Sequence, residues 1–245
     1  MDWRVVDLGR MSPALTAAMD EAVLISRTQG SVDNTLSFYT RDRPTVSLGY
    51  FEKASECIDL NLCRELGIVI VRRLSGGSAI YTDSGQIIYT LTLGDELVPE
   101  NPKESYPLIC AGVVNALRSL GIAAEHRPLN DVVVRGRKIS GSAQTRRARV
   151  VLQHGTVIVD SDLDTMMRVI LQRPGKPRSR EEMTSISLEL GRTIEKDEIK
   201  NALVAGFEKA FAVTTYRSTL TAGEQEMSRK LSEEKYGKEV FTFQR

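Results

Sequence analysis

The sequence predicts an α+β fold, in which a mixed, largely antiparallel β-sheet is flanked by helices. Strand-like and helix-like segments are interspersed along the whole chain, and tight turns join more of the strands than helical crossovers do. Tight turns connect antiparallel strands, whereas parallel neighbours need a long connection. The chain should therefore build a large sheet whose apolar faces are covered by helices.

The first half of the chain contains most of the strand-like segments. Residues 3–7 are a candidate short edge strand, and residues 13–26 carry Leu15, Met19 and Ala22 at roughly helical spacing. A short helix is expected at residues 60–66. Alternation and turn chemistry predict further strands at residues 35–40, 45–48, 68–72, 79–81 and 87–93.

The clearest helix lies at residues 106–120. Ile109, Val113 and Leu117 recur on one of its faces, and Gly121 is placed to end it. A flexible basic loop is expected further on, at residues 174–177. The other expected elements are strands at 131–134 and 138–140, one long strand or a strand pair at 150–159, and helices at 163–170, 197–211 and 223–236.

The length of 245 residues allows one large domain or two small ones. We expect a boundary near residues 174–180, with a core at 1–180 and a helical part of the same domain at 181–245, without a separate accessory domain. The formal net charge of +1 gives no overall positive potential that would attract nucleic acid. No segment contains the run of about 18 apolar residues that is needed to cross a bilayer. Neither nucleic acid nor a membrane is therefore an expected partner.

Cysteine and histidine are scarce in this chain. The three cysteines, Cys57, Cys63 and Cys110, have no CxxC spacing, and only two histidines accompany them. This is poor material for a zinc site, and an odd number of cysteines does not indicate a disulfide framework. A reducing, cytoplasmic location is expected.

A glycine-rich segment follows the expected strand at residues 68–72. Arg72 and Arg73 lead into a Ser-Gly-Gly-Ser sequence, and another strand comes next. Glycines let the backbone approach a ligand closely, and successive N–H groups can form an anion-binding nest. One arginine can bind a phosphate or carboxylate there while the other braces the sheet. The alternative is a plain hairpin with solvated arginines, and the spacing fits neither a P-loop nor a dinucleotide fingerprint.

The second segment with chemical potential spans residues 130–144. Lys138 follows the turn residues Arg135 and Gly136 and precedes a run of small residues. A lysine in such a place can hold an acyl carboxylate beside a phosphate and stabilise the charge that builds as they react. Asp131 is placed to hold a magnesium ion, which prefers carboxylate and phosphate oxygens. The alternative is a basic hairpin whose lysine points to solvent.

The third segment is the Gln-His-Gly-Thr sequence at residues 153–156, inside an apolar stretch. No GxSxG motif accompanies it, so a Ser/His/Asp hydrolase is not indicated. We interpret His154 as a packed strand residue more readily than as a general base. Cys110 falls on the apolar side of a helix and is interpreted as a core residue.

Taken in this order, the three segments resemble the lipoate–protein ligase and octanoyltransferase family, which shares its catalytic fold with biotin–protein ligases. The family's signature is an arginine-rich strand, a glycine loop, a His-Asp pair, an Asn-Asp, a Gly-Arg-Lys-Ile-Ser-Gly-type segment and a His-Gly. The matching residues are Arg72 to Gly77, Asp83, Asn130, Asp131, Gly136 to Gln144 and His154 to Thr156. Residues 19–22, 38–39 and 47–51 also look like the family's opening segments.

The resemblance implies that Lys138 is the catalytic residue and contacts both the lipoyl carbonyl and the adenylate phosphate. It implies ATP as co-substrate, magnesium on Asp131, lipoate as substrate and no tightly bound cofactor. The implied partner is a lipoyl-domain carrier, of the glycine-cleavage H protein or 2-oxoacid dehydrogenase E2 type. Residues implied to bind the substrate or lipoyl-AMP are Arg72, Arg73, Ser75, Gly76, Gly77, Ser78, Ala79, Tyr81, Asn130, Asp131, Ser140, Gly141, Ser142, Ala143, His154, Gly155 and Thr156.

Two activities share this scaffold, and the position of a nucleophile separates them. The cysteine transferases most like this chain carry their nucleophile before the Gly-Arg-Lys segment, where residues 125–131 contain no cysteine. We therefore predict an ATP-dependent lipoate–protein ligase that forms lipoyl-AMP and modifies a carrier lysine. An octanoyl or lipoyl transferase and a non-catalytic lipoyl-binding subunit are the alternatives. The short tail after Phe211 suggests that an accessory ligase piece would be a separate subunit.

Three residues depart from the family's usual pattern. Ser78 stands at the third glycine of the loop, Thr82 replaces the histidine before Asp83, and Gln86 replaces an asparagine. A side chain at position 78 adds bulk and restricts positive φ. These changes are interpreted as retuning the pocket or as marking a different acyl group.

Overall fold

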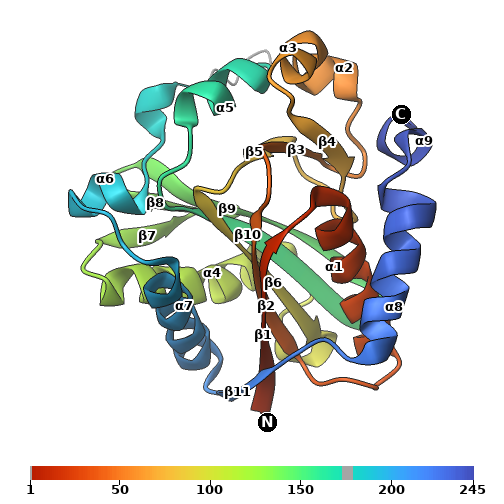
Figure 1. The fold of residues 1–245 in the computed structure, drawn as a ribbon. Coiled ribbons are helices and arrows are strands. Elements are labelled where there is room, and N and C mark those ends of the chain that lie inside the picture. The colour runs from red at the N-terminus through yellow and green to blue at the C-terminus, as the bar shows by residue number, and fades with distance from the viewer. Residues whose placement is uncertain (1, 173–178) are drawn as a thin grey trace.

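The computed structural model describes residues 2–172 and 179–245. The basic loop expected at residues 174–177, and with it most of the expected boundary region at 174–180, lies outside the described residues. Residues on both sides of this gap belong to one layered structure, because the last strand of the chain joins the sheet that begins at its first strand (Figure 1).

A large sheet and a small sheet organise the chain. The large sheet contains, in spatial order, β11 (Thr214–Ser218), β1 (Asp2–Met11), β2 (Thr35–Arg41), β6 (Gln86–Gly94), β10 (Val150–Ile158), β9 (Arg137–Arg147), β8 (Asp131–Val134) and β7 (Ala124–Arg127). The small sheet contains β4 (Val69–Arg72), β3 (Thr45–Leu48) and β5 (Ile80–Thr82). In the large sheet β1 runs parallel to both of its neighbours, and the other pairs are antiparallel. The predicted fold class is confirmed.

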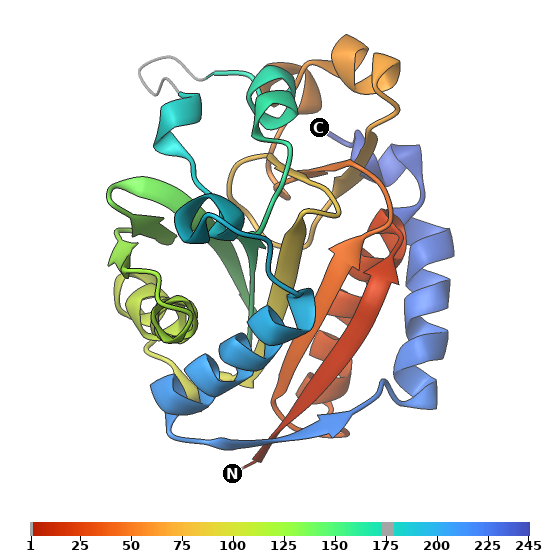
Figure 2. The same cartoon turned by 60° about the vertical axis from the view of Figure 1, so that its left-hand side comes forward.

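Helices cover both faces of the large sheet, as Figures 1 and 2 show. Besides short 3-10 turns at η1 (Asp95–Leu97) and η2 (Arg180–Glu182) and a π turn at η3 (Ser232–Tyr236), the helices are α1 (Pro13–Thr28), α2 (Ala54–Cys57), α3 (Leu60–Glu65), α4 (Pro102–Ser119), α5 (Leu163–Val169), α6 (Ile186–Leu190), α7 (Lys196–Phe211), α8 (Ala222–Leu231) and α9 (Glu239–Thr242). Within the two described stretches, no helix combines the length and apolar character needed to span a bilayer.

The main core lies between the sheet and the pair α4 and α7. Trp3, Phe38 and Tyr89 point from alternate positions of three strands into this core. The two helices pack closely at Gly112. A side chain there would collide with the ring of Phe207, so only glycine fits. The predicted helix at residues 106–120 is confirmed as the larger part of α4, and Gly121 follows it with φ of +84°.

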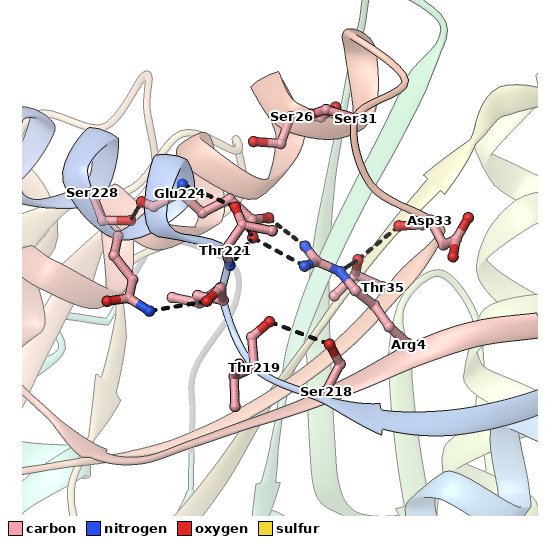
Figure 3. Close-up of polar contacts among 12 residues, drawn as sticks. Arg4, Ser26, Ser31, Asp33, Thr35, Ser218, Thr219, Thr221, Glu224 and Ser228 are labelled. Carbon is pink, nitrogen blue, oxygen red and sulfur yellow. Dashed lines mark hydrogen bonds and ion pairs between the residues drawn. The ribbon is translucent and has the colours of Figure 1, made fainter.

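The opposite face is covered by α1 and α8. Arg4, on β1, and Glu224, on α8, form an ion pair there that is closed to solvent, with 3% and 0% of their side chains exposed (Figure 3). Arg4 Nη1 donates to Glu224 Oε2 at 3.0 Å, and Arg4 Nε donates to Thr35 Oγ1 at 2.7 Å. Glu224 also accepts the backbone N–H of Thr221 at 2.8 Å and thereby caps its own helix. This network joins the first strand to the last long helix.

Two expectations need correction, and one strand was missed. Residues 3–7 do not form a short edge strand, because β1 lies between β2 and β11. Strand β11 was missed because most of its residues are at least partly exposed and polar, which leaves no apolar alternation to detect. The strand expected at residues 138–140 extends through Arg147, because its small and polar residues pair with β10 along nearly their whole length. Of the two alternatives for residues 150–159, one long strand is confirmed as β10, which spans Val150–Ile158.

Candidate active site

A tight hairpin places Lys138 at the edge of the site. Between β8 and β9, Arg135 and Gly136 have φ of +50° and +77°, which is the pattern of a type I′ turn. Glu189 of α6 pairs with Arg137 at 2.6 Å and also with Arg135, and the carboxylate is almost fully buried. Burial raises the pKa of Glu189, but the hydrogen bond from Thr184 and the two arginines outweigh it and lower that pKa. The buried Glu189 carboxylate therefore holds the hairpin in place.

The Lys138 side chain lies along its own strand, beside Gly141. Its Nζ lies 2.6 Å from Asp131 Oδ1, and its carbonyl accepts the backbone N–H of Thr184 at 2.9 Å. An added Cβ at Gly141 would lie 2.6 Å from Lys138 Cε and Nζ, so Gly141 provides the space that the lysine occupies. The lysine is 32% exposed, so its ammonium remains reachable from solvent.

Asp131 holds two cations in this arrangement. Its Oδ2 accepts a hydrogen bond from Arg127 Nη2 at 2.9 Å, while its Oδ1 pairs with Lys138. In the described parts of the chain, no group of three His, Cys, Asp or Glu side chains is arranged to hold a metal ion. Both oxygens of the Asp131 carboxylate are engaged by these cations, so the carboxylate positions Lys138, and magnesium binding at Asp131 stays a prediction.

The two arginines of the glycine-rich segment bind backbone carbonyls. Arg72 is fully buried and donates to the carbonyls of Gly49, Tyr50, Glu52, Phe241 and Thr242. Arg73 donates to the carbonyls of Ser47, Gly76 and Ser78 at 2.6–2.8 Å and so fixes the course of the loop. Burial lowers the pKa of Arg73 to about 10, which leaves it cationic at neutral pH. Arg73 reaches the cavity described below, whereas Arg72 faces away from it.

His154 connects the glycine loop to α1. Its Nε2 lies 2.6 Å from Ser75 Oγ, and its Nδ1 lies 3.0 Å from Asp20 Oδ2. Asp20 Oδ1 accepts a hydrogen bond from Thr90 Oγ1 at 3.0 Å. Serine hydrolases use such a Ser–His–Asp row to activate a hydroxyl. Here Ser75 is fully buried and does not line the cavity, so the row braces the loop.

Replacement of His154 by alanine should therefore loosen the loop. The change leaves the buried hydroxyl of Ser75 and one oxygen of Asp20 without this partner, so we expect the free energy of unfolding to fall by about 1–3 kcal/mol. Chemical denaturation measures this loss, and faster tryptic cleavage after Arg72 or Arg73 would report the opened loop. His126→Ala, at the chain's only other histidine, is the matched control. Equal effects of the two substitutions would contradict a bracing role.

A cavity of about 350 Å³ lies beside Lys138, between the large sheet, the glycine loop, α1 and α5. Four residues in adjacent strands, paired in register, form its floor: Gly141, Thr156, Ile88 and Tyr39. Neighbouring strands are about 4.8 Å apart, so the floor extends about 14 Å from Gly141 to Tyr39. The volume lies within the range of pockets that enclose small ligands.

Most residues expected at the site line this cavity. They are Arg73, Gly77, Ser78, Ala79, Tyr81, Asn130, Asp131, Lys138, Gly141, Ser142, Ala143, His154, Gly155 and Thr156. Arg72, Ser75, Gly76 and Ser140 do not line it, and the first three support the loop or its neighbours instead.

Sequence reasoning missed the part of the lining that comes from α1, β2, β6 and α5. The polar members are Asp20, Arg41 and Gln86, and the apolar members include Met166 and Met167. Asp20 offered a signal, because it is a carboxylate on the buried face of an amphipathic helix. Gln86 stands out as a departure from the family's usual asparagine, whereas Arg41, Met166 and Met167 sit in ordinary strand or helix patterns and gave no signal.

Comparison with known proteins shows which family the chain is related to. A model of the lipoyl protein ligase A/B catalytic domain matches residues 12–208. The chain belongs to that family. Octanoyltransferase LipM from Carboxydothermus hydrogenoformans is 35% identical, covering 98% of each chain. A crystal structure of lipoate-protein ligase A bound with ATP has a TM-score of 0.88 and 28% identity, covering 99% of each chain.

A third relative comes from Thermoplasma acidophilum. It is a bi-partite lipoate protein ligase, described with its E2 lipoyl domain, with a TM-score of 0.85 and 26% identity over 99% of this chain and 96% of its own. Membership of the family therefore establishes an enzyme of the ligase and octanoyltransferase group and confirms the fold drawn from the resemblance.

The ligase activity predicted from the sequence is wrong. The prediction gave most weight to the missing cysteine before the Gly-Arg-Lys segment. Several relatives with 30% identity or more over nearly the full length are octanoyltransferases, including the LipM protein described above. The absence of one nucleophile at one position was weaker information than agreement along the whole chain.

Proposed function

We propose that this enzyme transfers an octanoyl group from a carrier-bound thioester to the lysine of a lipoyl domain. The observation that carries the proposal is the cavity, which has a cationic Lys138 at one end and a strand floor about 14 Å long, enough for an extended eight-carbon chain. The full-length likeness to octanoyltransferases supports the choice of acyl group. The E2 lipoyl domain described with the Thermoplasma acidophilum relative supports the choice of acceptor.

Lys138 supplies the electrostatic part of the reaction. With the acyl carbonyl beside its Nζ, the ammonium stabilises the negative charge that develops on the carbonyl oxygen when an amine attacks. Asp131 keeps the ammonium in place, and Gly141 leaves room for it. The thioester is already activated, so this reaction consumes no ATP.

A cysteine intermediate is not supported by the positions of the thiols. Cys57, Cys63 and Cys110 are buried, and no cysteine lines the cavity in the part of the chain that the structure describes. Burial raises the pKa of Cys63 to about 11 and that of Cys110 to about 12, whereas a nucleophilic thiol needs a lowered pKa. We infer direct transfer: the acceptor amine attacks the carbonyl, the C–S bond breaks, and the amine's proton passes to the thiolate.

The proposed function is tested by a transfer assay. The purified chain is mixed with an octanoyl thioester of an acyl carrier protein and an unmodified lipoyl domain, without ATP. Mass spectrometry should find octanoyl on the lipoyl-domain lysine, and a lipoyl domain with that lysine replaced by arginine should stay unmodified. Absence of octanoyl from the intact lipoyl domain would overturn the proposal.

The direct route makes a separate prediction about the cysteines. A variant with Cys57→Ala, Cys63→Ala and Cys110→Ala should keep most of the transfer rate, whereas removal of a true nucleophile costs on the order of 10⁶-fold. Mass spectrometry of the wild-type enzyme with the thioester alone should find no acylated cysteine. Thermal unfolding of the variant controls for loss of core packing, because all three thiols are buried. An octanoyl–cysteine adduct that disappears on addition of the lipoyl domain would disprove direct transfer.

A further inference from the structure

A buried guanidinium lies at the end of the cavity away from Lys138. Arg41 is 4% exposed, and it lines the cavity at the end of β2. Its Nε donates to Thr82 Oγ1 at 3.2 Å, its Nη1 donates to Thr16 Oγ1, and its guanidinium stacks over Tyr39. Among the described residues Arg41 makes no ion pair, which is unusual for a buried charge.

One nitrogen of this guanidinium is available to a ligand. Arg41 Nη2 has no hydrogen-bond partner in residues 2–172 and 179–245. Nor is it one of the polar atoms that are both without a partner and fully buried, so it is not closed off from solvent. It therefore faces open space, and the space that Arg41 lines is the cavity. A guanidinium N–H is a strong donor, so a group placed there is favoured if it can accept a hydrogen bond.

The position of Arg41 corresponds to the far end of an acyl chain. Tyr39 is the last residue of the cavity floor that starts at Gly141, and Arg41 follows two residues later on the same face of β2. If the carbonyl lies at Lys138, as the proposed function requires, a chain of eight carbons along this floor ends near Arg41. Thr82 and Gln86, which both depart from the family's usual residues, line the same end.

A methyl group is a poor match for this end of the cavity. An alkyl terminus would displace water from Nη2 without replacing its hydrogen bond, and an unsatisfied buried donor is costly. An oxygen or a polarisable sulfur at the same place would accept from Nη2. Burial, together with the nearby Asp20 carboxylate, also raises the pKa of Tyr39, so its hydroxyl stays protonated beside the guanidinium.

We propose that Arg41 is a specificity residue that selects acyl groups bearing a hydrogen-bond acceptor at their far end over acyl groups that end in a methyl group. The acceptor can be a hydroxyl, a carboxylate or a ring sulfur. The inference rests on the proposed function for the direction in which the chain lies. It ranks octanoyl, which ends in a methyl group, as a substrate that is accepted but binds less tightly than an acceptor-bearing acyl group of the same length.

Binding of free acids tests the inference without any transfer reaction. Octanoate, 8-hydroxyoctanoate and octanedioate are titrated into the wild-type chain by calorimetry. We expect the two acceptor-bearing acids to bind about tenfold more tightly than octanoate, which corresponds to about 1.4 kcal/mol. Lipoate, added as a fourth acid, tests whether ring sulfurs suffice as acceptors, and tighter binding than octanoate is the supporting result.

Arg41→Met removes the donor while keeping an unbranched side chain, and it should invert the order so that octanoate binds best. Arg43→Met is the matched control, because Arg43 lies two residues after Arg41, its side chain is 60% exposed, and among the described residues it forms an ion pair only with Asp42. It should leave the order of the acids unchanged. Should Arg41→Met unfold, equal binding of the acids by the wild type would still overturn the inference.

The outcomes separate the inference from the proposed function. If octanoyl is transferred in the assay above while octanoate binds as tightly as the other acids, the inference is overturned and the proposed function stands. If transfer fails but the acids bind in the expected order and Arg41→Met inverts it, the inference stands and the proposed function falls. Equal inversion by Arg43→Met would overturn the assignment to Arg41.

Discussion

Replacement of Lys138 by alanine is expected to lower the rate of octanoyl transfer by about 10²–10³-fold, the usual cost of losing one preorganised donor to a developing oxyanion. The loss should appear in kcat, because the ammonium acts on charge that forms during the reaction rather than on the bound acyl chain. The measurement is a transfer time course with octanoyl–carrier thioester and lipoyl domain, followed by mass spectrometry of the lipoyl domain.

Two comparisons make this result specific. Lys103→Ala, at an exposed lysine near the start of α4, should leave the rate unchanged. Gly141→Ala should also lower the rate, because a Cβ there would occupy the space that Lys138 Cε and Nζ now fill. Full transfer activity in Lys138→Ala would remove the lysine from the mechanism and favour a structural role for the hairpin.

The second large effect is expected on stability, at Arg4. Arg4→Met leaves the Glu224 carboxylate buried without its cation, and breaking a buried ion pair in this way costs about 3–5 kcal/mol. For a chain of this size the melting temperature should fall by on the order of 10 °C. Figure 3 shows why the effect is concentrated there, since both nitrogens at the tip of Arg4 point at Glu224.

A double variant distinguishes the charge from the packing. Arg4→Met combined with Glu224→Leu removes both charges, so it should recover most of the lost stability, apart from about 1 kcal/mol for the helix cap that Glu224 provides. Differential scanning calorimetry of the wild type and the variants gives the comparison. A double variant less stable than Arg4→Met would show that the pair does not act through its buried charge.

The Arg4–Glu224 pair also makes the stability of the folded chain depend on pH. Burial raises the pKa of Glu224, but the hydrogen bonds from Arg4 and Thr221 outweigh it and hold that pKa below its ordinary value. A carboxyl with a lowered folded-state pKa contributes stability above its unfolded pKa and loses it as the pH falls through the folded value. The wild type should therefore lose this contribution in acid, whereas Arg4→Met should show little of that loss.

Local chemistry in the sequence predicted most of the longer helices and strands and about half of the residues that line the site. Apolar residues at helical spacing with a terminal glycine placed α4, and the Arg-Gly turn placed the hairpin that carries Lys138. These features depend on residues close together in the chain, so they could be read before the fold was known. The ordered motifs also identified the family, although the weight given to one absent cysteine led to the wrong activity.

Only the tertiary structure decided what the polar side chains do. Lys138 and Asp131 are seven positions apart across a turn, but His154 meets Ser75 and Asp20 across 79 and 134 residues. Arg72 had the sequence signature of a ligand-binding arginine, yet it binds carbonyls from residues 49–52 and 241–242. Arg41 showed no signal at all, because an arginine at a strand end is normally solvated. Contacts between distant segments, and the burial they create, determine which charges are paired and which remain free to bind a substrate, and neither can be read from neighbouring residues.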